Sequence, residues 1–408
     1  MNAIQTNCPP FLPTAELFKL DDLLVPDRRA EWETLLRTFD HPNKLQQSPE
    51  WLEHQQSIGA GEQFSAVGMR DIEGRLYGLV PLGFGHWNLD YSLKVINLWR
   101  TRLCCINILG SLPLLPPNVQ TYDKVFQCIH NSFPHYDCIL MRMLPTDSFL
   151  YRYLHESKFI NDHFLCYVPD GLNVNHFISL PASFEEYLTK FNSKKRYNLK
   201  RQIRMLREHG GGQLSMRRIE QSRDVPFFVD GADYVVQRSW QGARSGEELI
   251  DRGQKWQRML TDLADRGILR SYLLLCADKP CAYVLGYQFR GVFYYVQIGY
   301  DQALSQYSPG TSLLYMLIED LIVYNKASLL TFGFGDNNYK QEFGNLRSQD
   351  ALMILLRKNG LNRSRRFFHS TFRKTGLSLR KYLRRCKSSF SRIKELAAFR
   401  SSKKTDRS

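Results

Sequence analysis

Apolar and polar positions follow two periods along this chain, and they predict strands and helices in mixed order. In the first half, segments 64–70 and 75–84 flank a turn-forming "DIEG" and predict an antiparallel hairpin. Further strands are predicted at 92–99 and 136–144, and helices at 30–39, 48–57, 119–133 and 145–157. The second half repeats this order of elements without a clear sequence repeat. Its predicted strands are 175–181, 213–220, 327–335, 351–358 and three antiparallel strands within 268–301, and its predicted helices are 183–191, 192–210, 225–240, 252–267 and 308–322.

This pattern predicts an α/β fold with a mixed sheet, built from two similar halves. We place the domains at 1–170 and 171–360, followed by a basic tail at 361–408 that is partly helical or disordered.

Serines mark two helix starts. Ser48 precedes Pro49, and Ser183 stands three residues before Glu186, which is the spacing of a reciprocal N-terminal cap.

Charge is distributed unevenly along the 408 residues. The net charge is +15, yet residues 361–408 hold 16 lysines and arginines and only two acids. The first 360 residues are therefore close to neutral, and a basic isoelectric point does not make the whole chain a nucleic-acid binder. The tail, with aromatic residues among its cations, suits an anionic membrane surface, a partner protein or, less well, nucleic acid.

Cysteine and histidine usage suggests neither disulfides nor a metal site. The nine cysteines form no C-x-x-C pair, and Cys138, Cys276 and Cys281 fall in strand-like runs, where free thiols pack as small core residues. We expect a reducing cytoplasm, and the basic tail would allow a peripheral position at the inner face of the membrane. The ten histidines form no H-x-x-x-H pair near carboxylates, so no metal is expected. The N-terminus lacks the pattern of a signal peptide, and proline interrupts the longest uncharged stretch.

The segment "QYSPGTSLLYMLIEDLI", at 306–322, changes from turn-forming residues to an apolar helix. Pro309 suits a first helical turn, and Gly310 lets backbone approach a ligand. Thr311, Ser312 and the following residue then offer N–H groups at a helix N-terminus, which suits a pyrophosphate. The alternative is an ordinary strand-to-helix turn with Ser308 as its cap.

The order of motifs resembles the GNAT acyltransferases. Three antiparallel strands at 268–301 precede "YSPGTSLL", and "FGFGDNNYKQEFG" follows it. With "RYNLKRQIRML" at 196–206, these segments look like the GNAT subgroup found with bacterial cellulose and exopolysaccharide genes (CelD-like). That subgroup is related to the Fem-like transferases, which have two tandem GNAT-like domains. The resemblance is best over about residues 180–345, looser over 45–170, and excludes the tail. It implies two tandem GNAT-like domains here.

The resemblance also implies a donor site and catalytic groups. Acyl-CoA, typically acetyl-CoA, would lie between two separated strands, with Tyr307, Gly310, Thr311 and Ser312 at the pyrophosphate loop. Tyr307 and Ser312 depart from the family pattern, which has Gln or Arg first and Gly or Ala last. Asp336 would act as base or hold the acceptor, Tyr339 would protonate the leaving thiolate, and Lys340 would pair with Asp336 or a phosphate. The alternative is a salt-bridged loop that stabilises the turn.

A basic helix is predicted next to this region. "SKKRYNLKRQIRML" carries seven cations with Arg207, while Leu199, Ile203 and Leu206 form one apolar stripe. Its polar surface is either simply solvated or binds an anionic ligand. Arg196 and Lys195 are our candidates for substrate binding, and Trp240 is a candidate for lining the acceptor cleft.

These observations favour an acyl-CoA-dependent N- or O-acyltransferase acting on a sugar or a cell-envelope or exopolysaccharide precursor. Two alternatives stay open at this point. One is a Fem-like transferase that uses aminoacyl-tRNA, and the other is a catalytically silent scaffold in a polysaccharide synthesis complex.

Overall fold

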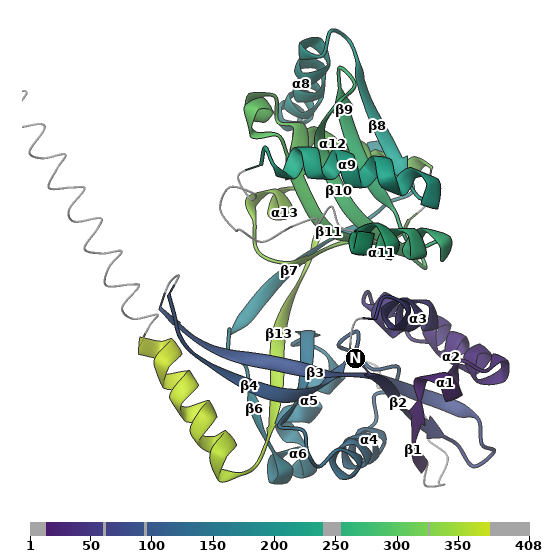
Figure 1. Ribbon diagram of the computed structural model, residues 1–408, viewed down its shortest axis with the longest axis vertical. Helices are drawn as coiled ribbons and strands as arrows, with labels where there is room; N and C mark the ends of the chain where they lie inside the picture. Colours follow the sequence, from purple (N-terminus) through teal and green to yellow (C-terminus); the bar gives the residue numbers. More distant parts are fainter. Residues whose placement is uncertain (1–13, 60–62, 94–95, 240–253, 325–326, 376–408) are drawn as a thin grey trace, which may run out of the picture.

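The computed structural model describes residues 14–59, 63–93, 96–239, 254–324 and 327–375, and forms two lobes joined by two long strands (Figure 1). The first lobe contains β1 (Thr14–Lys19), α1 (Leu20–Leu23), α2 (Pro26–Thr38), η1 (Lys44–Gln47), α3 (Pro49–Ser57), β2 (Gln63–Arg70), β3 (Leu76–Leu93), β4 (Ile96–Ile108), α4 (Val119–Ser132), β5 (Cys138–Pro145), α5 (Phe149–Glu156), α6 (Lys158–His163) and β6 (Phe164–Tyr167). The second contains α7 (Phe184–Leu188), α8 (Ser193–His209), β8 (Leu214–Ile219), η2 (Ser222–Asp224), α9 (Val225–Val236), α11 (Gln254–Asp265), β9 (Ser271–Cys276), β10 (Lys279–Phe289), β11 (Val292–Tyr300), η3 (Gln302–Tyr307), α12 (Pro309–Val323), β12 (Leu329–Phe334) and α13 (Asn338–Phe343). The joining strands are β7 (Leu172–Ser179) and β13 (Leu346–Arg357).

The two lobes repeat one chain path. In the first, the antiparallel strands β2, β3 and β4 lead through α4 into β5, which runs parallel to β4. In the second, the antiparallel strands β9, β10 and β11 lead through α12 into β12, which runs parallel to β11. A parallel neighbour requires a crossover connection, and both lobes use one helix for it. The predicted mixed α/β fold with two similar halves is therefore confirmed.

The strands β7 and β13 exchange between the lobes. β7 pairs with β12 of the second lobe and with β13. β13 pairs with β7 near its start and then, from Asp350 to Leu356, with β5 of the first lobe. One continuous sheet results, in the order β1-β2-β3-β4-β5-β13-β7-β12-β11-β10-β9-β8. The domain boundaries at 170 and 360 stay a prediction, because the sheet runs through both halves without a break.

Helices cover both faces of the second lobe's sheet. On one face, α7, α8 and α12 pack their apolar side chains against β9–β12, and Leu199 and Leu206 of α8 are buried there as the apolar stripe predicted. On the other face, α9 and α11 pack against β9–β11, and Leu45 and Trp51 of the first lobe join this cluster. The second lobe therefore has its core on two sides of the sheet, and the first lobe contributes to one of them.

Side-chain caps explain where several helices begin. Ser48 Oγ accepts from the Trp51 amide at 3.2 Å, and Ser183 Oγ accepts from the Glu186 amide at 3.1 Å, so both predicted caps are confirmed. Asn192 Oδ1 accepts from the Lys195 amide at 2.8 Å and starts the basic helix α8. Each of these bonds satisfies an amide that the helix itself leaves without a partner.

One predicted strand is wrong. The segment 92–99 is predicted as a single strand, but β3 ends at Leu93 and β4 begins at Ile96, with these two residues paired in antiparallel register. The apolar run therefore spans the end of a long hairpin. Periodicity alone cannot distinguish a continuous strand from two strands that meet within an apolar run.

The three cysteines predicted as core residues are buried. Burial raises the pKa of the Cys281 thiol to about 12, which keeps this group in its unreactive protonated form. The pKa values of the Cys138 and Cys276 thiols are raised as well.

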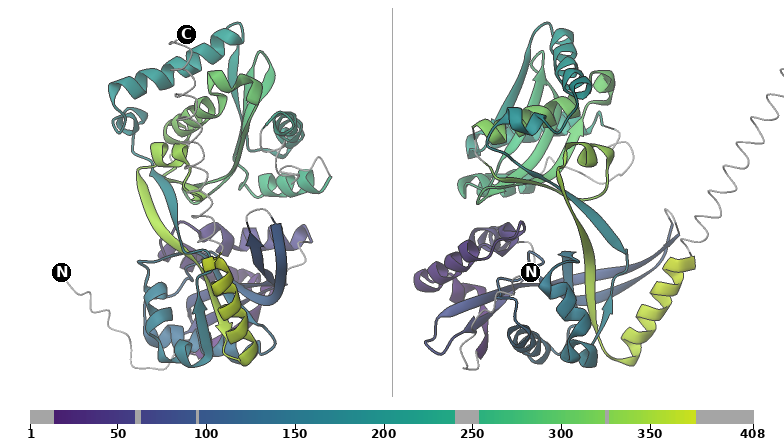
Figure 2. Two further views of the ribbon diagram at one scale, coloured as in Figure 1. Left: turned by 90° about the vertical axis from the view of Figure 1, so that its left-hand side faces the viewer. Right: turned by 180° about the vertical axis from the view of Figure 1, so that it is seen from behind.

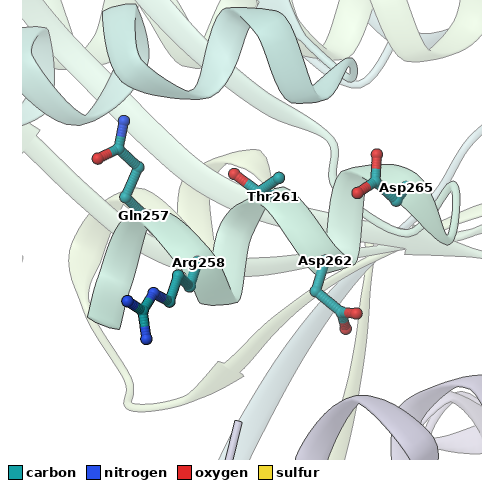
Figure 3. A pocket seen from close by; sticks show the side chains of 5 residues that line it. All are labelled: Gln257, Arg258, Thr261, Asp262 and Asp265. Carbon is teal, nitrogen blue, oxygen red and sulfur yellow. The ribbon is translucent and has the colours of Figure 1, made fainter. Parts of the chain in front are cut away.

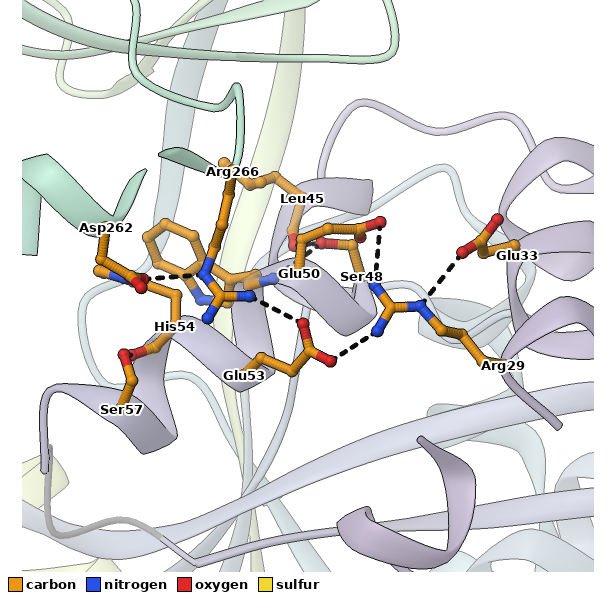
Figure 4. Close-up of polar contacts among 11 residues, drawn as sticks. Arg29, Glu33, Leu45, Ser48, Glu50, Glu53, His54, Ser57, Asp262 and Arg266 are labelled. Atoms are coloured by element: carbon orange, nitrogen blue, oxygen red, sulfur yellow. Dashed lines mark hydrogen bonds and ion pairs between the residues drawn. The ribbon is translucent and has the colours of Figure 1, made fainter. Parts of the chain in front are cut away.

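Charged residues connect the lobes where α3 meets α11 (Figure 4). Asp262 of α11 accepts from Arg266 at 2.8 Å and lies 2.6 Å from the buried ring of His54. Arg266 also bonds Glu53 of α3 at 2.7 Å, and Glu53 in turn bonds Arg29 of α2. A network with shared partners fixes the relative position of the elements better than isolated surface pairs do.

The beginning of the tail is helical. Residues 360–375 form a helix that packs against the first lobe, and residues 376–408 lie outside the described part of the chain (Figure 2). Within the described residues, no helix has both the length and the apolar character needed to cross a membrane.

Candidate active site

The strands β11 and β12 separate after a short paired stretch. They pair only from Val292 to Tyr294 on β11 and from Leu329 to Thr331 on β12, although β11 continues to Tyr300. A bulge in the β10–β11 pairing, where Leu285 faces Gln297 and Gly286 faces Tyr295, bends β11 at this point. Backbone groups of β11 beyond Tyr294 that point toward β12 therefore lack a strand partner on that side.

A pocket of about 320 Å³ opens where these strands diverge. It is lined by Ser239, which follows α9, and by residues from β11, from α12, and from α13 with the loop before it: Ile298, Gly299, Tyr300, Gly310, Thr311, Leu314, Asn337, Tyr339 and Phe343. The pocket thus brings together three residues predicted from the sequence, namely Gly310, Thr311 and Tyr339. Its apolar walls end at a helix N-terminus, which is a suitable arrangement for an elongated ligand with an anionic end.

Two backbone amides at the start of α12 are available to such a ligand. Pro309 has no N–H, and the Ser312 amide donates to the Ser308 carbonyl at 3.0 Å. Gly310 and Thr311 are the first-turn residues between them, and neither amide donates to another described residue. A Cβ atom at Gly310 would lie 3.3 Å from the Tyr300 ring, so a glycine keeps this part of the pocket open.

The other residues predicted for this loop have different positions. Ser308 has left-handed backbone, with φ of 54°, and makes no side-chain cap, so the alternative of an ordinary Ser308 cap is wrong. The Ser312 amide belongs to the helix, which corrects the prediction that it is free, and its side chain is 1% exposed. Tyr307 stacks on His209 of α8, with ring centroids 4.5 Å apart, and is not among the residues lining the pocket.

Tyr339 is the polar side chain in the pocket best suited to proton transfer. It extends from α13, and its ring packs near Tyr295 and Phe332. Burial raises the pKa of its phenol, and the neighbouring Tyr295 and Asn337 side chains oppose that rise. The phenol is therefore protonated at neutral pH and can donate a proton to a developing anion.

Lys340 serves the fold. Its Nζ donates to the carbonyls of Phe332 at 2.9 Å and Phe334 at 2.6 Å, and the side chain is buried. Among the described residues it forms no ion pair with Asp336, so that predicted pairing is wrong. Burial lowers the pKa of Lys340. Lys340 connects α13 to the end of β12. A lysine suits this position because the three carbonyls at the strand end need a donor with several protons.

Asp336 lies at a second, adjoining pocket of about 370 Å³, which Val174, His176, Asp336, Gln341, Gly344, Asn345, Leu346 and Arg347 line. Its carboxylate lies 2.7 Å from His176 Nε2 and accepts from Gln341 Nε2 at 2.8 Å. The bond with His176, then that with Gln341, lowers the pKa of Asp336. Asp336 and Asn337 are consecutive yet line different pockets, so the two pockets meet at this loop.

Sequence reasoning missed His176. The signal was a polar pair, Asn175 and His176, directly before the apolar Phe177 and Ile178; both polar side chains are buried. Only the pairing of β7 with β12 brings His176 to Asp336, which is 160 residues away.

The predicted substrate-binding cations make contacts within the protein. Arg196 donates to the Phe191 carbonyl at 3.0 Å and to Ser193 Oγ at 3.3 Å. Lys195 pairs with Glu342 of α13, which connects the basic helix to the element that carries Tyr339. Trp240 lies outside the described residues, although its neighbour Ser239 lines the first pocket.

A larger hollow lies along α11 and lacks the features of a site. Its lining residues, Gln257, Arg258, Thr261, Asp262 and Asp265, all belong to this helix, and Figure 3 shows their side chains pointing to different sides of it. Asp262 already belongs to the network between the lobes. Across the described ranges, no three His, Cys, Asp or Glu side chains gather as a metal ligand set.

Comparison with known protein families finds a match within the second lobe. Residues 193–341 match the family model described as acetyltransferase (GNAT) domain. No curated protein matches the chain. Two solved structures share its fold. "Crystal structure of FemX" is 11% identical with a TM-score of 0.56, covering 81% of this chain and 96% of that one. A conserved protein of unknown function from Bacteroides thetaiotaomicron VPI-5482 is 10% identical with a TM-score of 0.52, covering 80% and 97%.

The matched range begins with α8 and ends within α13, so it includes the separated strands, the pocket and the start of α12. These are the parts that a group transfer from a bound donor requires. The chain is therefore an acyltransferase that carries a GNAT domain at residues 193–341, within a mixed α/β fold shared with FemX.

Proposed function

We propose that this protein transfers an acyl group from acyl-CoA to an amine or hydroxyl of a sugar or cell-envelope precursor. The observation that carries the proposal is the pocket between β11 and β12, which places the Gly310 and Thr311 amides and the Tyr339 phenol on one cavity. The exopolysaccharide context rests on the resemblance of the 196–206 and 332–344 motifs to the CelD-like subgroup.

The pocket residues fit an acyl-CoA donor. The amides of Gly310 and Thr311, at the positive end of the α12 dipole, would hold the pyrophosphate. Ile298 and Leu314 give apolar walls to the rest of the pocket. Coenzyme A supplies a thioester, whose carbonyl carbon accepts a nucleophile.

Transfer requires three roles, and this chain has a group for each. The Asp336–His176 pair would take the proton from the attacking amine or hydroxyl, because the carboxylate is ionised at neutral pH. An unpaired N–H of β11 beyond Tyr294 would donate to the carbonyl oxygen as negative charge develops there. Tyr339 would donate its phenolic proton to the departing thiolate. The new C–N or C–O bond forms as the C–S bond breaks.

A second donor class, aminoacyl-tRNA, is favoured by one surface. The cations of α8 include exposed Lys194, Lys200, Arg201, Arg204 and Arg207, and such a row suits a phosphate backbone. The scaffold alternative predicts that the pocket binds no donor at all.

The test is calorimetric titration of the full chain with acetyl-CoA and with longer acyl-CoAs. Binding of one molecule per chain supports the proposal, and stabilisation of the folded state by the same ligand must accompany it. Unacylated CoA serves as the control for recognition of the nucleotide end alone. Absence of binding by every CoA, combined with transfer from aminoacyl-tRNA, would establish the second donor class. If the protein neither binds any CoA nor transfers from aminoacyl-tRNA, the alternative of a catalytically silent scaffold would be supported.

A further inference from the structure

The helix at residues 360–375 has two unlike faces. Its inner face is fixed to the first lobe. His369 is buried against Tyr91 and Tyr167, with ring centroids 5.0 Å and 5.7 Å away, and Arg365 bonds Asp137 at 2.9 Å. This face covers the apolar cluster that includes Leu89, Leu103 and Leu356. The helix is therefore a constant part of the fold, which holds its outer face in a defined position.

The outer face exposes large apolar side chains. Phe367 is 64% exposed and Phe368 63%, and Leu361, 60% exposed, lies about two turns before Phe368 on the same side of the helix. Two adjacent phenylalanines in water are unfavourable unless something covers them. Figure 1 shows this helix, in yellow, on the outer side of the first lobe and away from the second lobe.

The β3–β4 hairpin extends the same surface. Trp99, 68% exposed, is paired in register with Tyr91. Directly opposed residues of an antiparallel pair share one face, so Trp99 lies on the face where Tyr91 meets Phe372 of the helix, 5.6 Å away. The hairpin end and the C-terminal end of the helix lie beside each other in Figures 1 and 2.

Cations accompany these aromatic residues. Residues 360–375 contain five lysines and arginines and no aspartate or glutamate; Arg365 and Arg373 pair with Asp137 and Asp170, and Arg363 is exposed on the outer side, one turn before Phe367. The sequence after this helix continues with eleven cations and two acids. Exposed aromatic rings within a basic surface match the interface of an anionic bilayer, where rings enter the headgroup region and cations meet phosphates.

We propose that the surface formed by Leu361, Phe367, Phe368 and Trp99, with Arg363, docks this protein on an anionic lipid membrane. The inference does not depend on which acyl donor the second lobe uses. In this proposal charge attracts the protein to the membrane and the aromatic rings hold it there.

The test is co-sedimentation of the full chain with vesicles of phosphatidylcholine mixed with phosphatidylglycerol, and with vesicles of phosphatidylcholine alone. Wild-type protein should bind the anionic vesicles, and high salt should weaken that binding. A Phe367→Ser/Phe368→Ser variant should partition roughly tenfold more weakly, since both rings leave the interface. An Arg363→Ala variant should bind the anionic vesicles about fivefold more weakly at low salt.

Matched controls use the same residue types elsewhere. Phe227→Ser removes an exposed phenylalanine of the second lobe, and Arg75→Ala an exposed arginine far along the chain; both should bind as wild type does. Unchanged vesicle binding by the phenylalanine double variant would overturn the proposal and leave the tail's charge as the sole cause. A wild-type dimer that the double variant breaks, without vesicle binding, would also overturn it in favour of self-association.

Discussion

His176 Nε2 lies 2.7 Å from Asp336 Oδ1, and the two residues come from β7 and from the loop after β12. The imidazole is buried while the carboxylate is more than half exposed, so the pair spans from the core to the second pocket. This contact is possible because β7 joins the second lobe's sheet next to β12.

Removal of either member of this pair should slow transfer. Asp336→Asn keeps the shape and removes the charge, and we expect a fall of about 10²-fold or more in kcat, with donor affinity unchanged. His176→Gln should shift the acidic limb of the kcat profile to higher pH, because the contact that lowers the pKa of Asp336 is lost. Initial rates across pH measure both effects. Near-normal turnover in Asp336→Asn would remove this residue as the base.

Tyr339→Phe should lower kcat by about 10²-fold and leave the donor KM near its original value, since the ring stays in the pocket and only the proton is lost. Because the pKa of Tyr339 is raised, any dependence of the wild-type rate on this proton should appear only at strongly alkaline pH. Steady-state kinetics with Tyr324→Phe, an exposed tyrosine at the end of α12, gives the control. Equal kcat in both variants would contradict the role of the phenol.

Substitution of Gly310 should affect donor binding in a graded way. A Cβ atom would lie 3.3 Å from the Tyr300 ring, so Gly310→Ala should weaken acetyl-CoA binding slightly and Gly310→Val by more than about tenfold. Calorimetry on the three proteins measures the series. Gly360→Val is a useful control, because nothing lies within 4 Å of a Cβ atom there. Wild-type affinity in Gly310→Val would place the donor elsewhere.

Lys340→Met should destabilise the protein by about 2–3 kcal/mol, because buried carbonyls of Phe332 and Phe334 lose their donor. Urea unfolding compares it with Lys194→Met, which changes an exposed lysine of α8. If Lys340→Met retained full stability but lost activity, the lysine would belong to the chemistry after all.

Stability should fall as the pH drops below about 6.5, in part because of His41. Burial, reinforced by the charge of Lys44, lowers the pKa of His41 to about 4. Between pH 6.5 and 4 the unfolded chain binds a proton that the folded chain excludes, so acid favours unfolding. His41→Leu should reduce the loss between pH 7 and pH 5 by about 2 kcal/mol, and exposed His135→Leu should not. If the free energy of unfolding depends on pH in the same way in wild type and His41→Leu, His41 does not cause the loss of stability in acid.

Several features of both lobes were predictable because their signals are local. The apolar stripe of α8, the caps Ser48 and Ser183, and the Pro309–Gly310 start of α12 each depend on residues within a few positions. Such features follow from helix periodicity and from the unsatisfied amides of a helix start, which a sequence displays directly.

The sequence alone determined the order of strands and helices, the position of the α12 N-terminus and the uneven charge. Tertiary structure decided which side chains meet. Lys340 donates to backbone carbonyls, and Asp336 contacts His176, which is 160 residues away in the sequence. The sequence could not show the second contact, because strand pairing between distant segments has no local signature. Tertiary structure also decided that β13 leaves the second lobe to pair with β5, and that Phe367 and Phe368 face outward. A helix pattern shows that one face is apolar, but only the packed fold shows which face the protein itself covers.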